Sequence, residues 1–244
     1  MAFKIVSFLL VVFLLVSCGH TPENEANRQS VHFAASGMND GIPAALVHDG
    51  KQFHLFFQGK INGDENKWEQ TISSDLIHWE KSETLQLPDS SGVIKSAGFV
   101  IDWDDTSGLA KDGQQPLIAI YQTVSTDILQ LAYSYDFGKT WTRYTERQIS
   151  LGTPVSDYKI SKIIWHEESQ KWILMATGRD HVRFYSSENL IDWQLNSTFT
   201  EVLDYISGEW DYADFFPLID AESNKTKWVL MVSYHLLNPS SGAG

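Results

Sequence analysis

Two acidic residues stand in sequence surroundings that could support acid and base chemistry. Asp40 lies in Gly37-Met38-Asn39-Asp40-Gly41, and Asp211 lies in Glu209-Trp210-Asp211-Tyr212-Ala213-Asp214-Phe215-Phe216. A carboxylate among aromatic and apolar neighbours is desolvated, which raises its pKa toward the value that a general acid needs at neutral pH. Two carboxyl groups that face one another across a pocket are the smallest set of side chains that usually cleaves a glycosidic bond. The competing interpretations are a turn cap and a satisfied buried polar residue.

The elements that must position these residues are short β-strands. From about residue 31 onward, aromatic and β-branched residues alternate between turn residues, and no helical periodicity is evident. Asp49-Gly50 separates two such runs and supplies residues that tolerate positive φ, as a tight hairpin requires. The sequence therefore predicts an all-β protein with strands over residues 45–48, 52–58, 98–103, 117–122, 129–134, 162–166, 172–177, 182–186 and 228–234.

A repeated hairpin motif indicates a β-propeller. A polar turn followed by a tryptophan ends at Trp79, Trp141 and Trp193, which lie 62 and 52 positions apart. This period suits one four-stranded propeller blade, which needs about 40–55 residues. We expect each tryptophan to pack between adjacent blades. Functional side chains should lie near the start of each blade, because the inner strand of a blade faces the central channel.

The repeat divides the chain into three blades and part of a fourth. The predicted blades cover residues 38–88, 95–149 and 157–200, and a further one begins near residue 210. A propeller closes with several blades, and an unclosed ring exposes sheet faces and edges. We therefore expect the chain to be a fragment or a truncated product, with a small or swapped assembly as the alternative.

The first eighteen residues differ in composition from the rest of the chain. After Lys4, the run from Ile5 to Val16 is almost wholly apolar, which matches a signal peptide and is shorter than the ~20 residues that span a bilayer. The ending Leu15-Val16-Ser17-Cys18 resembles a bacterial lipobox, in which the cysteine is lipidated. We therefore expect residues 1–18 to be a lipoprotein signal peptide and Cys18 to anchor the exported protein to a membrane of the bacterial cell envelope, on the periplasmic side or at the cell surface. A buried core strand is the competing interpretation. Residues 19–32 read as a flexible polar tether and residues 33–244 as the propeller domain.

Composition and charge exclude several classes of protein. The chain has 244 residues, of which 43% are hydrophobic, and a net charge of −13, so it can bury a sizeable core but has the wrong sign of charge for binding nucleic acid. Without residues 1–18, 17 basic and 31 acidic residues leave a charge of −14, which favours a neutral ligand over a polyanion. One cysteine cannot form an internal disulfide, and the eight histidines lack zinc-ligand spacing. We expect neither a metal nor another cofactor.

Several blocks, in register along the chain, carry a family resemblance. Met38-Asn39-Asp40 and the later His54-Leu55-Phe56-Phe57-Gln58 are similar to a Trp-Met-Asn-Asp-Pro-Asn-Gly block and the His-Leu-Phe-Tyr-Gln strand that follows it. The segments 68–80, 131–141 and 182–187 match further blocks in the same order. Over essentially all of residues 33–244, the chain resembles glycoside hydrolase family 32, the invertase, levanase and inulinase family of fructan-cleaving enzymes.

The resemblance implies a five-bladed β-propeller, here incomplete with roughly three to four blades, whose funnel holds three acidic residues. Asp40 matches the nucleophile, and Asp211 matches the acid/base residue, which is a glutamate in the family. The third position, a carboxylate that stabilises the transition state, falls on Ile160. The family residues that line the first sugar subsite fall on Asn39, Gln58, Trp68 and Ser96.

Two functions of different classes follow from these residues. The first is an exported, lipid-anchored glycosidase that cleaves fructose-containing oligo- or polysaccharides, including sucrose-like sugars, by a retaining double displacement. The second is a catalytically impaired propeller that binds a fructan or another neutral glycan. Retention of Asp40 favours the first, whereas Ile160 and the shorter Asp211 favour the second. A hydrolase acting on a different furanoside would also explain these substitutions.

Overall fold

The structure, a computed structural model, describes residues 42–61, 64–81, 83–88, 93–124, 128–152, 157–200 and 208–236. The predicted signal peptide and the predicted tether lie outside these ranges. Within the ranges, no helix has the length and apolar character that crossing a membrane would require. The helical structure there is one 3-10 turn, η1 (Glu167–Ser169), so the prediction of an all-β protein is confirmed.

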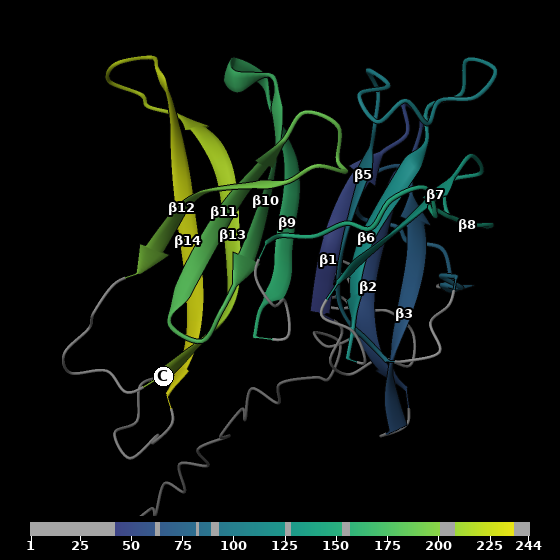
Figure 1. Ribbon diagram of the computed structural model, residues 1–244, viewed down its shortest axis with the longest axis horizontal. Helices are drawn as coiled ribbons and strands as arrows, with labels where there is room; N and C mark the ends of the chain where they lie inside the picture. The colour runs from purple at the N-terminus through teal and green to yellow at the C-terminus, as the bar shows by residue number, and fades with distance from the viewer. Residues whose placement is uncertain are drawn as a thin grey trace, which may run out of the picture.

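The described strands form four antiparallel sheets, of which three have four strands and the last is a hairpin (Figure 1). The sheets fall at the positions that the tryptophan repeat predicts for the blades. Their strands are β1 (Ile42–His48), β2 (Phe53–Ile61), β3 (Asp64–Ser73) and β4 (Glu83–Thr84); β5 (Ile94–Ile101), β6 (Leu117–Thr123), β7 (Leu129–Ser134) and β8 (Thr142–Arg143); β9 (Lys159–His166), β10 (Lys171–Thr177), β11 (His181–Ser187) and β12 (Gln194–Thr200); and β13 (Gly208–Ile219) with β14 (Thr226–Leu236).

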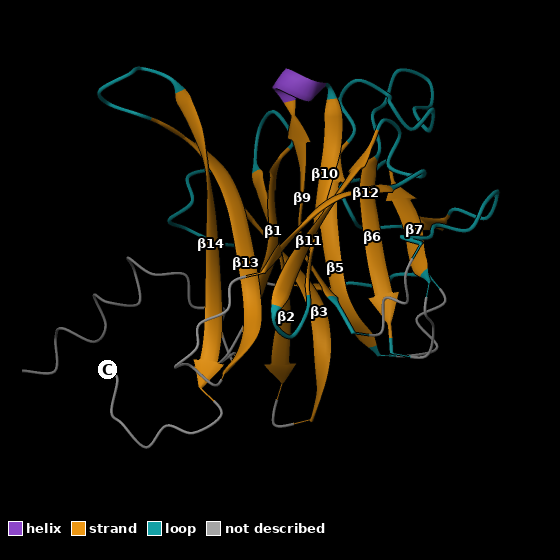
Figure 2. Cartoon of the chain, turned by 60° about the vertical axis from the view of Figure 1, so that its left-hand side comes forward, coloured by secondary structure: helices purple, strands orange, loops and turns teal. Residues whose placement is uncertain are grey.

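The first strand of each sheet is the innermost one. β1 contacts β5, β5 contacts β9, and β9 contacts β13, so four strands from distant parts of the sequence meet at the centre. Figure 2 shows the strands side by side, with η1 and many of the loops at one end of the molecule. This arrangement places the beginnings of the four inner strands together, as the propeller prediction requires.

Among the described residues, three apolar cores lie between successive sheets. Phe56 of the first sheet stacks on Phe99 of the second with ring centroids 4.2 Å apart, within a cluster that includes Trp68. The second and third sheets share a larger cluster, and the third sheet packs on the hairpin through Met175, Val182 and Ala213. Burial of these side chains away from water stabilises the stack of sheets, because each fully buried large apolar side chain contributes about 1.5–3 kcal/mol.

The second and third sheets approach most closely at a glycine. A Cβ atom placed on Gly98 of β5 would lie 2.7 Å from Cδ1 of Ile163 and 3.3 Å from Cγ2 of Ile160, both on β9. Contacts shorter than about 3.4 Å are tighter than ordinary van der Waals packing. Glycine at this position therefore allows β5 and β9 to pack at their observed separation.

A buried polar network joins the first sheet to the second. His54, with 3% of its surface exposed, has Nε2 3.0 Å from a carboxylate oxygen of Asp49 and Nδ1 2.8 Å from Nε2 of Gln70. Gln70 also donates to the carbonyl oxygen of Phe137 at 2.8 Å, so the His54 Nδ1 accepts and its Nε2–H donates. Burial alone would raise the pKa of Asp49, but hydrogen bonds from the Gln52 amide, the His54 ring and the Lys51 amide lower it to about 2.

The repeated turns share one hydrogen-bonding pattern. A serine hydroxyl bonds an aspartate or asparagine two residues later, and a tryptophan indole donates to a carbonyl three residues before it, at Trp79, Trp141 and Trp193. In the first copy the serine is Ser73, whose hydroxyl bonds Asp75. Trp141 packs against the core of the first two sheets and Trp193 against that of the next two, as predicted. Trp79 is half-buried, and its indole bonds Leu76.

The predicted strands are all present, but several observed ones are not among those predicted. β12 (Gln194–Thr200) is exposed along its whole length, and Leu195 and Phe199 are its only large apolar residues, so it lacks the regular apolar alternation on which the prediction rests. β3 begins with the polar and charged residues Asp64 to Lys67, so it also lacks the apolar alternation at its start and was not predicted. The hairpin at Asp49-Gly50 is confirmed by a Gly50 φ of 95° and by a 3.0 Å hydrogen bond from the Asp49 amide to the Gln52 carbonyl.

Candidate active site

One cavity of about 420 Å³ gathers all four of the predicted site residues that the structure describes. Gln58, Trp68, Ser96 and Asp211 all line it, although they come from β2, β3, β5 and β13. Ile160, at the position of the missing carboxylate, lines the same cavity. Asn39, Asp40 and Cys18 lie outside the described residues, but β1 begins two positions after Asp40, at Ile42, which is also part of the cavity wall. The volume suits a ligand of sugar size.

Each of the four inner strands contributes a β-bulge to this cavity. One residue of the inner strand has no counterpart in the register of the neighbouring strand at four places: Ala44, Lys95, Ser161 and Asp211. All four of these residues line the cavity. A bulge redirects a side chain out of the normal alternation of a strand and is common next to active sites. The four bulges thus explain how inner strands that pack against one another can also present side chains to a ligand.

The predicted subsite residues hold the backbone of β5 and β9 in place. Gln58 Nε2 and Trp68 Nε1 both donate to the carbonyl oxygen of Ile94, at 3.4 and 3.2 Å. Ser96 Oγ accepts from the amide of Ile160 at 2.9 Å and donates to Gln122 Oε1 at 3.4 Å. These polar side chains therefore line the cavity and also hold the backbone of the strands that form its wall.

Asp211 carries an ion pair that its sequence neighbours did not predict. Lys159 Nζ lies 2.9 Å from Asp211 Oδ1 and 5.2 Å from the centre of the Tyr212 ring. The sequence predicted an apolar setting for this carboxylate, and the structure gives it a cationic partner on the neighbouring inner strand instead. Because the two side chains are 41% and 36% exposed, the pair adds little to stability, on the order of 1 kcal/mol or less. Its importance lies in the orientation that it imposes on the carboxylate.

Two further side chains in the cavity wall have shifted proton affinities. Burial lowers the pKa of Lys95; Asp157 opposes the shift and Lys159 adds to it. Burial raises the pKa of the Tyr212 hydroxyl, which Lys159 lowers and Asp211 raises. Lys95 is one of several cavity residues that the sequence did not predict, and the signal for it was a charged residue directly before Ser96 in a mostly apolar run.

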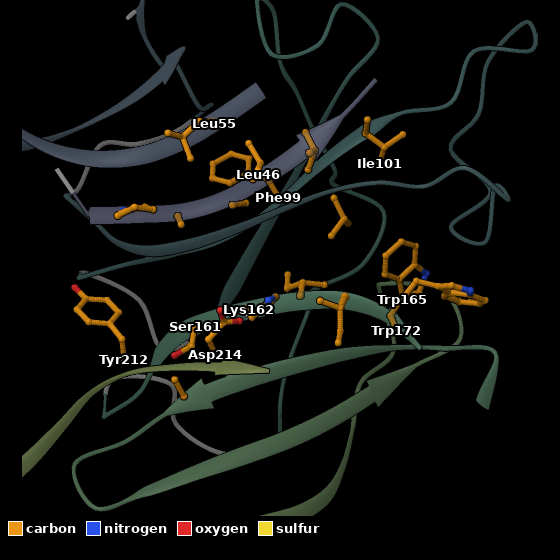
Figure 3. A pocket seen from close by; sticks show the side chains of 18 of the residues that line it. Leu46, Leu55, Phe99, Ile101, Ser161, Lys162, Trp165, Trp172, Tyr212 and Asp214 are labelled. Atoms are coloured by element: carbon orange, nitrogen blue, oxygen red, sulfur yellow. Dashed lines mark hydrogen bonds and ion pairs between the residues drawn. The ribbon is translucent and has the colours of Figure 1, made fainter. Parts of the chain in front are cut away.

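The cavity continues into a larger groove of 910 Å³ between the inner strands. Ala44, Ser161 and Tyr212 line both spaces. Figure 3 shows Tyr212 at one end of the groove and Trp165 with Trp172 at the other, and Lys162 pairs with Asp214 between them. The groove wall is mostly apolar, so the polar groups needed to orient a sugar are concentrated in the smaller cavity.

Among the described residues, no three His, Cys, Asp or Glu side chains converge in a way that could hold a metal ion. The chemistry available in the cavity is that of carboxylate, ammonium, amide and hydroxyl groups.

Comparisons with known proteins show what the whole chain is similar to. Residues 32–242 match the Glycosyl hydrolases family 32 N-terminal domain. The chain is 32% identical to a levanase of Bacillus subtilis over 229 residues (91% of this chain, 34% of that protein), and 32% identical to an extracellular exo-inulinase of Aspergillus awamori over 270 residues (96% and 49%). The chain thus spans between about a third and a half of these relatives.

Solved structures show the same architecture. The exo-inulinase of Aspergillus awamori aligns with a TM-score of 0.68 at 31% identity, over 83% of this chain and 45% of that one. A β-fructofuranosidase of Schwanniomyces occidentalis in complex with fructosyl-erythritol aligns with a TM-score of 0.68 at 27% identity, over 83% and 42%. The four sheets correspond to part of a five-bladed propeller, which confirms the predicted fold class.

Proposed function

Since the chain belongs to glycosyl hydrolases family 32, we propose that it is a glycosidase that cleaves fructose-containing oligo- or polysaccharides with retention of configuration. The observation that carries this proposal is the single cavity into which the bulged Asp211 projects together with Gln58, Trp68 and Ser96. The substrate would be a neutral fructan or a sucrose-like sugar.

The proposed mechanism uses two carboxylates. Asp211 donates a proton to the glycosidic oxygen while Asp40 attacks the anomeric carbon, so the glycosidic bond breaks and a fructosyl-enzyme forms. Asp211, now a carboxylate, then takes a proton from water, which displaces Asp40. Retaining enzymes of this kind hold the two carboxyl groups about 5–5.5 Å apart. Lys159 positions Asp211 through the 2.9 Å contact between its Nζ and the carboxylate Oδ1.

The two departures from the family pattern predict slow turnover. An aspartate in place of a glutamate withdraws the acid by roughly 1 Å, which can lower the rate by ~10²-fold. Ile160 is 7% exposed, belongs to the core between the second and third sheets, and bonds Ser96 through its amide, so its side chain offers no acceptor to a sugar hydroxyl. Hydrogen bonds at such a position supply several kcal/mol in the transition state.

These departures also support a second function. A propeller that has lost the stabilising carboxylate but kept Gln58, Trp68, Ser96 and Lys95 in one cavity retains the groups needed for binding a neutral glycan. A protein of this kind would capture fructans without cleaving them.

We further propose that the protein is exported and lipid-anchored through Cys18 in the bacterial cell envelope. Support comes from the apolar run that precedes this lipobox-like cysteine, and the exo-inulinase relative is extracellular. Metabolic labelling with an alkyne-tagged fatty acid would test the anchor. Label should appear in the unaltered chain and be absent from Cys18→Ser.

Fructose release from sucrose, inulin and levan tests the hydrolase directly. The full chain should release fructose, and Asp40→Asn and Asp211→Asn should each abolish the release while sugar binding persists. Activity that survives Asp40→Asn would reject the nucleophile assignment. Measurable binding without any release would leave the glycan-binding function in its place.

A further inference from the structure

We propose that Lys95 is a ligand-contacting residue whose ammonium group donates hydrogen bonds to hydroxyl oxygens of the bound sugar and helps to select it. The inference rests on the proposed function, because it assigns a further residue to the same cavity.

The first support is the direction in which Lys95 is presented. Ile94 pairs with Thr123 and Ser96 pairs with Gln122, so Lys95 is the extra residue of the β5 bulge. Asp211 is the extra residue of the corresponding bulge in β13. Both line the 420 Å³ cavity, so Lys95 occupies on its own inner strand the place that the acid occupies on another.

The second support is the way in which the bulge is held. The residue before Lys95 has its carbonyl oxygen fixed by Gln58 and Trp68, and the residue after it, Ser96, is fixed by the Ile160 amide and by Gln122. The carbonyl oxygen before Lys95 and the side chain after it are therefore held by groups from four other strands, β2, β3, β6 and β9. Such support from surrounding residues is what keeps a binding group within reach of its ligand.

The third support is electrostatic. Lys95 is half-buried, and its burial lowers its pKa, while Asp157 and Lys159 are the charged groups that act on it. An ammonium group has three donors, so a contact within the protein leaves donors for a ligand. A partly desolvated ammonium gains from hydrogen bonds to hydroxyl oxygens, because such charge-assisted bonds are about twice as strong as neutral ones.

The chemistry of the cavity gives Lys95 a specific task. Where the resemblance implies a carboxylate that accepts bonds from sugar hydroxyls, the chain has the apolar Ile160 on β9. Lys95 lies on β5, which packs against β9, and offers donors in place of that lost acceptor. The polarity of recognition is reversed: the sugar hydroxyl becomes the acceptor.

Affinity measurements on matched lysine variants test the proposal. Binding of sucrose and of a non-reducing inulin trisaccharide is measured by calorimetry in the Asp40→Asn chain, so that the ligand is not consumed. Lys95→Met should weaken binding about tenfold or more, which matches loss of one hydrogen bond to a charged group. Lys95→Arg should stay within about threefold. Lys139→Met, which removes an exposed turn lysine, should leave the affinity unchanged.

Chemical protection of Lys95 itself provides a test that does not depend on the folding of a lysine variant. Reductive methylation of lysines in the Asp40→Asn chain, which should leave sucrose uncleaved and therefore non-reducing, is followed by mass spectrometry with and without saturating sucrose. Sugar should slow the modification of Lys95 several-fold and leave that of Lys139 unchanged. Equal modification of Lys95 in both conditions, or unchanged affinity of a folded Lys95→Met, would overturn the inference and leave the proposed function standing. An unaltered chain that neither binds nor cleaves these sugars would overturn both.

Discussion

Replacing Gly98 with alanine tests the packing that aligns the two central walls of the cavity. The new Cβ would lie 2.7 Å from Ile163 Cδ1 and 2.8 Å from Cγ1, at least 0.6 Å inside ordinary contact. Overpacking of this kind destabilises by typically 1–3 kcal/mol. Alanine in a strand otherwise recovers roughly 0.5–1 kcal/mol relative to glycine. We therefore expect Gly98→Ala to lower the free energy of unfolding by about 1–2 kcal/mol.

Urea unfolding followed by tryptophan fluorescence measures this change. With a slope of about 3 kcal/mol per molar urea, the midpoint should fall by roughly 0.5 M. Ile163→Val removes the nearest methyl group and should cost about 0.5–1.5 kcal/mol alone. The double variant should be more stable than the sum of the two changes predicts, because the valine makes room for the alanine.

Gly98→Ala should also lower the affinity for the sugar. β5 and β9 carry the 2.9 Å bond between Ser96 Oγ and the Ile160 amide, so pushing the strands apart should also weaken sugar binding, and Ile163→Val should restore it in part. A Gly98→Ala chain that is as stable as the original, with additive effects in the double variant, would refute the close packing of β5 on β9.

Three other outcomes follow from local geometry. Leu76→Gly should raise stability by about 1 kcal/mol in urea unfolding, because Leu76 has a φ of 66° and is 44% exposed; a loss would contradict the strain argument. Leu190→Gly should instead lower stability by about 2–5 kcal/mol, because Leu190 has a similar φ of 63° but is fully buried in the core. Asp49, with its pKa lowered to about 2 in the folded chain, should contribute about 1–2 kcal/mol that is present above about pH 4 and lost as the pH falls toward 2. Asp49→Asn should therefore be less stable at pH 7 and show a flatter stability profile between pH 4 and 2.

The sequence predicted the fold better than it predicted the site. The aromatic and β-branched alternation, the Asp49-Gly50 turn and the tryptophan repeat are local signals, and each corresponds to an observed element. The resemblance placed Gln58, Trp68 and Ser96 at the first sugar subsite and matched Asp211 to the acid/base residue, and the structure brings these four residues to one cavity. The position of Asp40 remains a prediction.

What the sequence did not predict depends on contacts between distant segments. Lys159 and Asp211 are 52 residues apart, and their pairing arises only because β9 and β13 are neighbours. Bulges have no single composition, since Ala44, Lys95, Ser161 and Asp211 differ in size and charge. The role of Gln58 and Trp68 as anchors for the Ile94 carbonyl likewise has no local signal.

The four bulges separate the chemistry of this protein from its architecture. A bulge residue has no counterpart across the ladder, so its side chain can be exchanged without moving the hydrogen-bonded pairs on either side. Ala44, Lys95, Ser161 and Asp211 all face the cavity from the same hydrogen-bonded frame. A combinatorial library restricted to the codons of Ala44, Lys95 and Ser161, which keeps Asp211 as the proposed acid, should therefore yield many folded proteins with altered sugar preference, and substrate range in such a scaffold can diversify before stability becomes limiting.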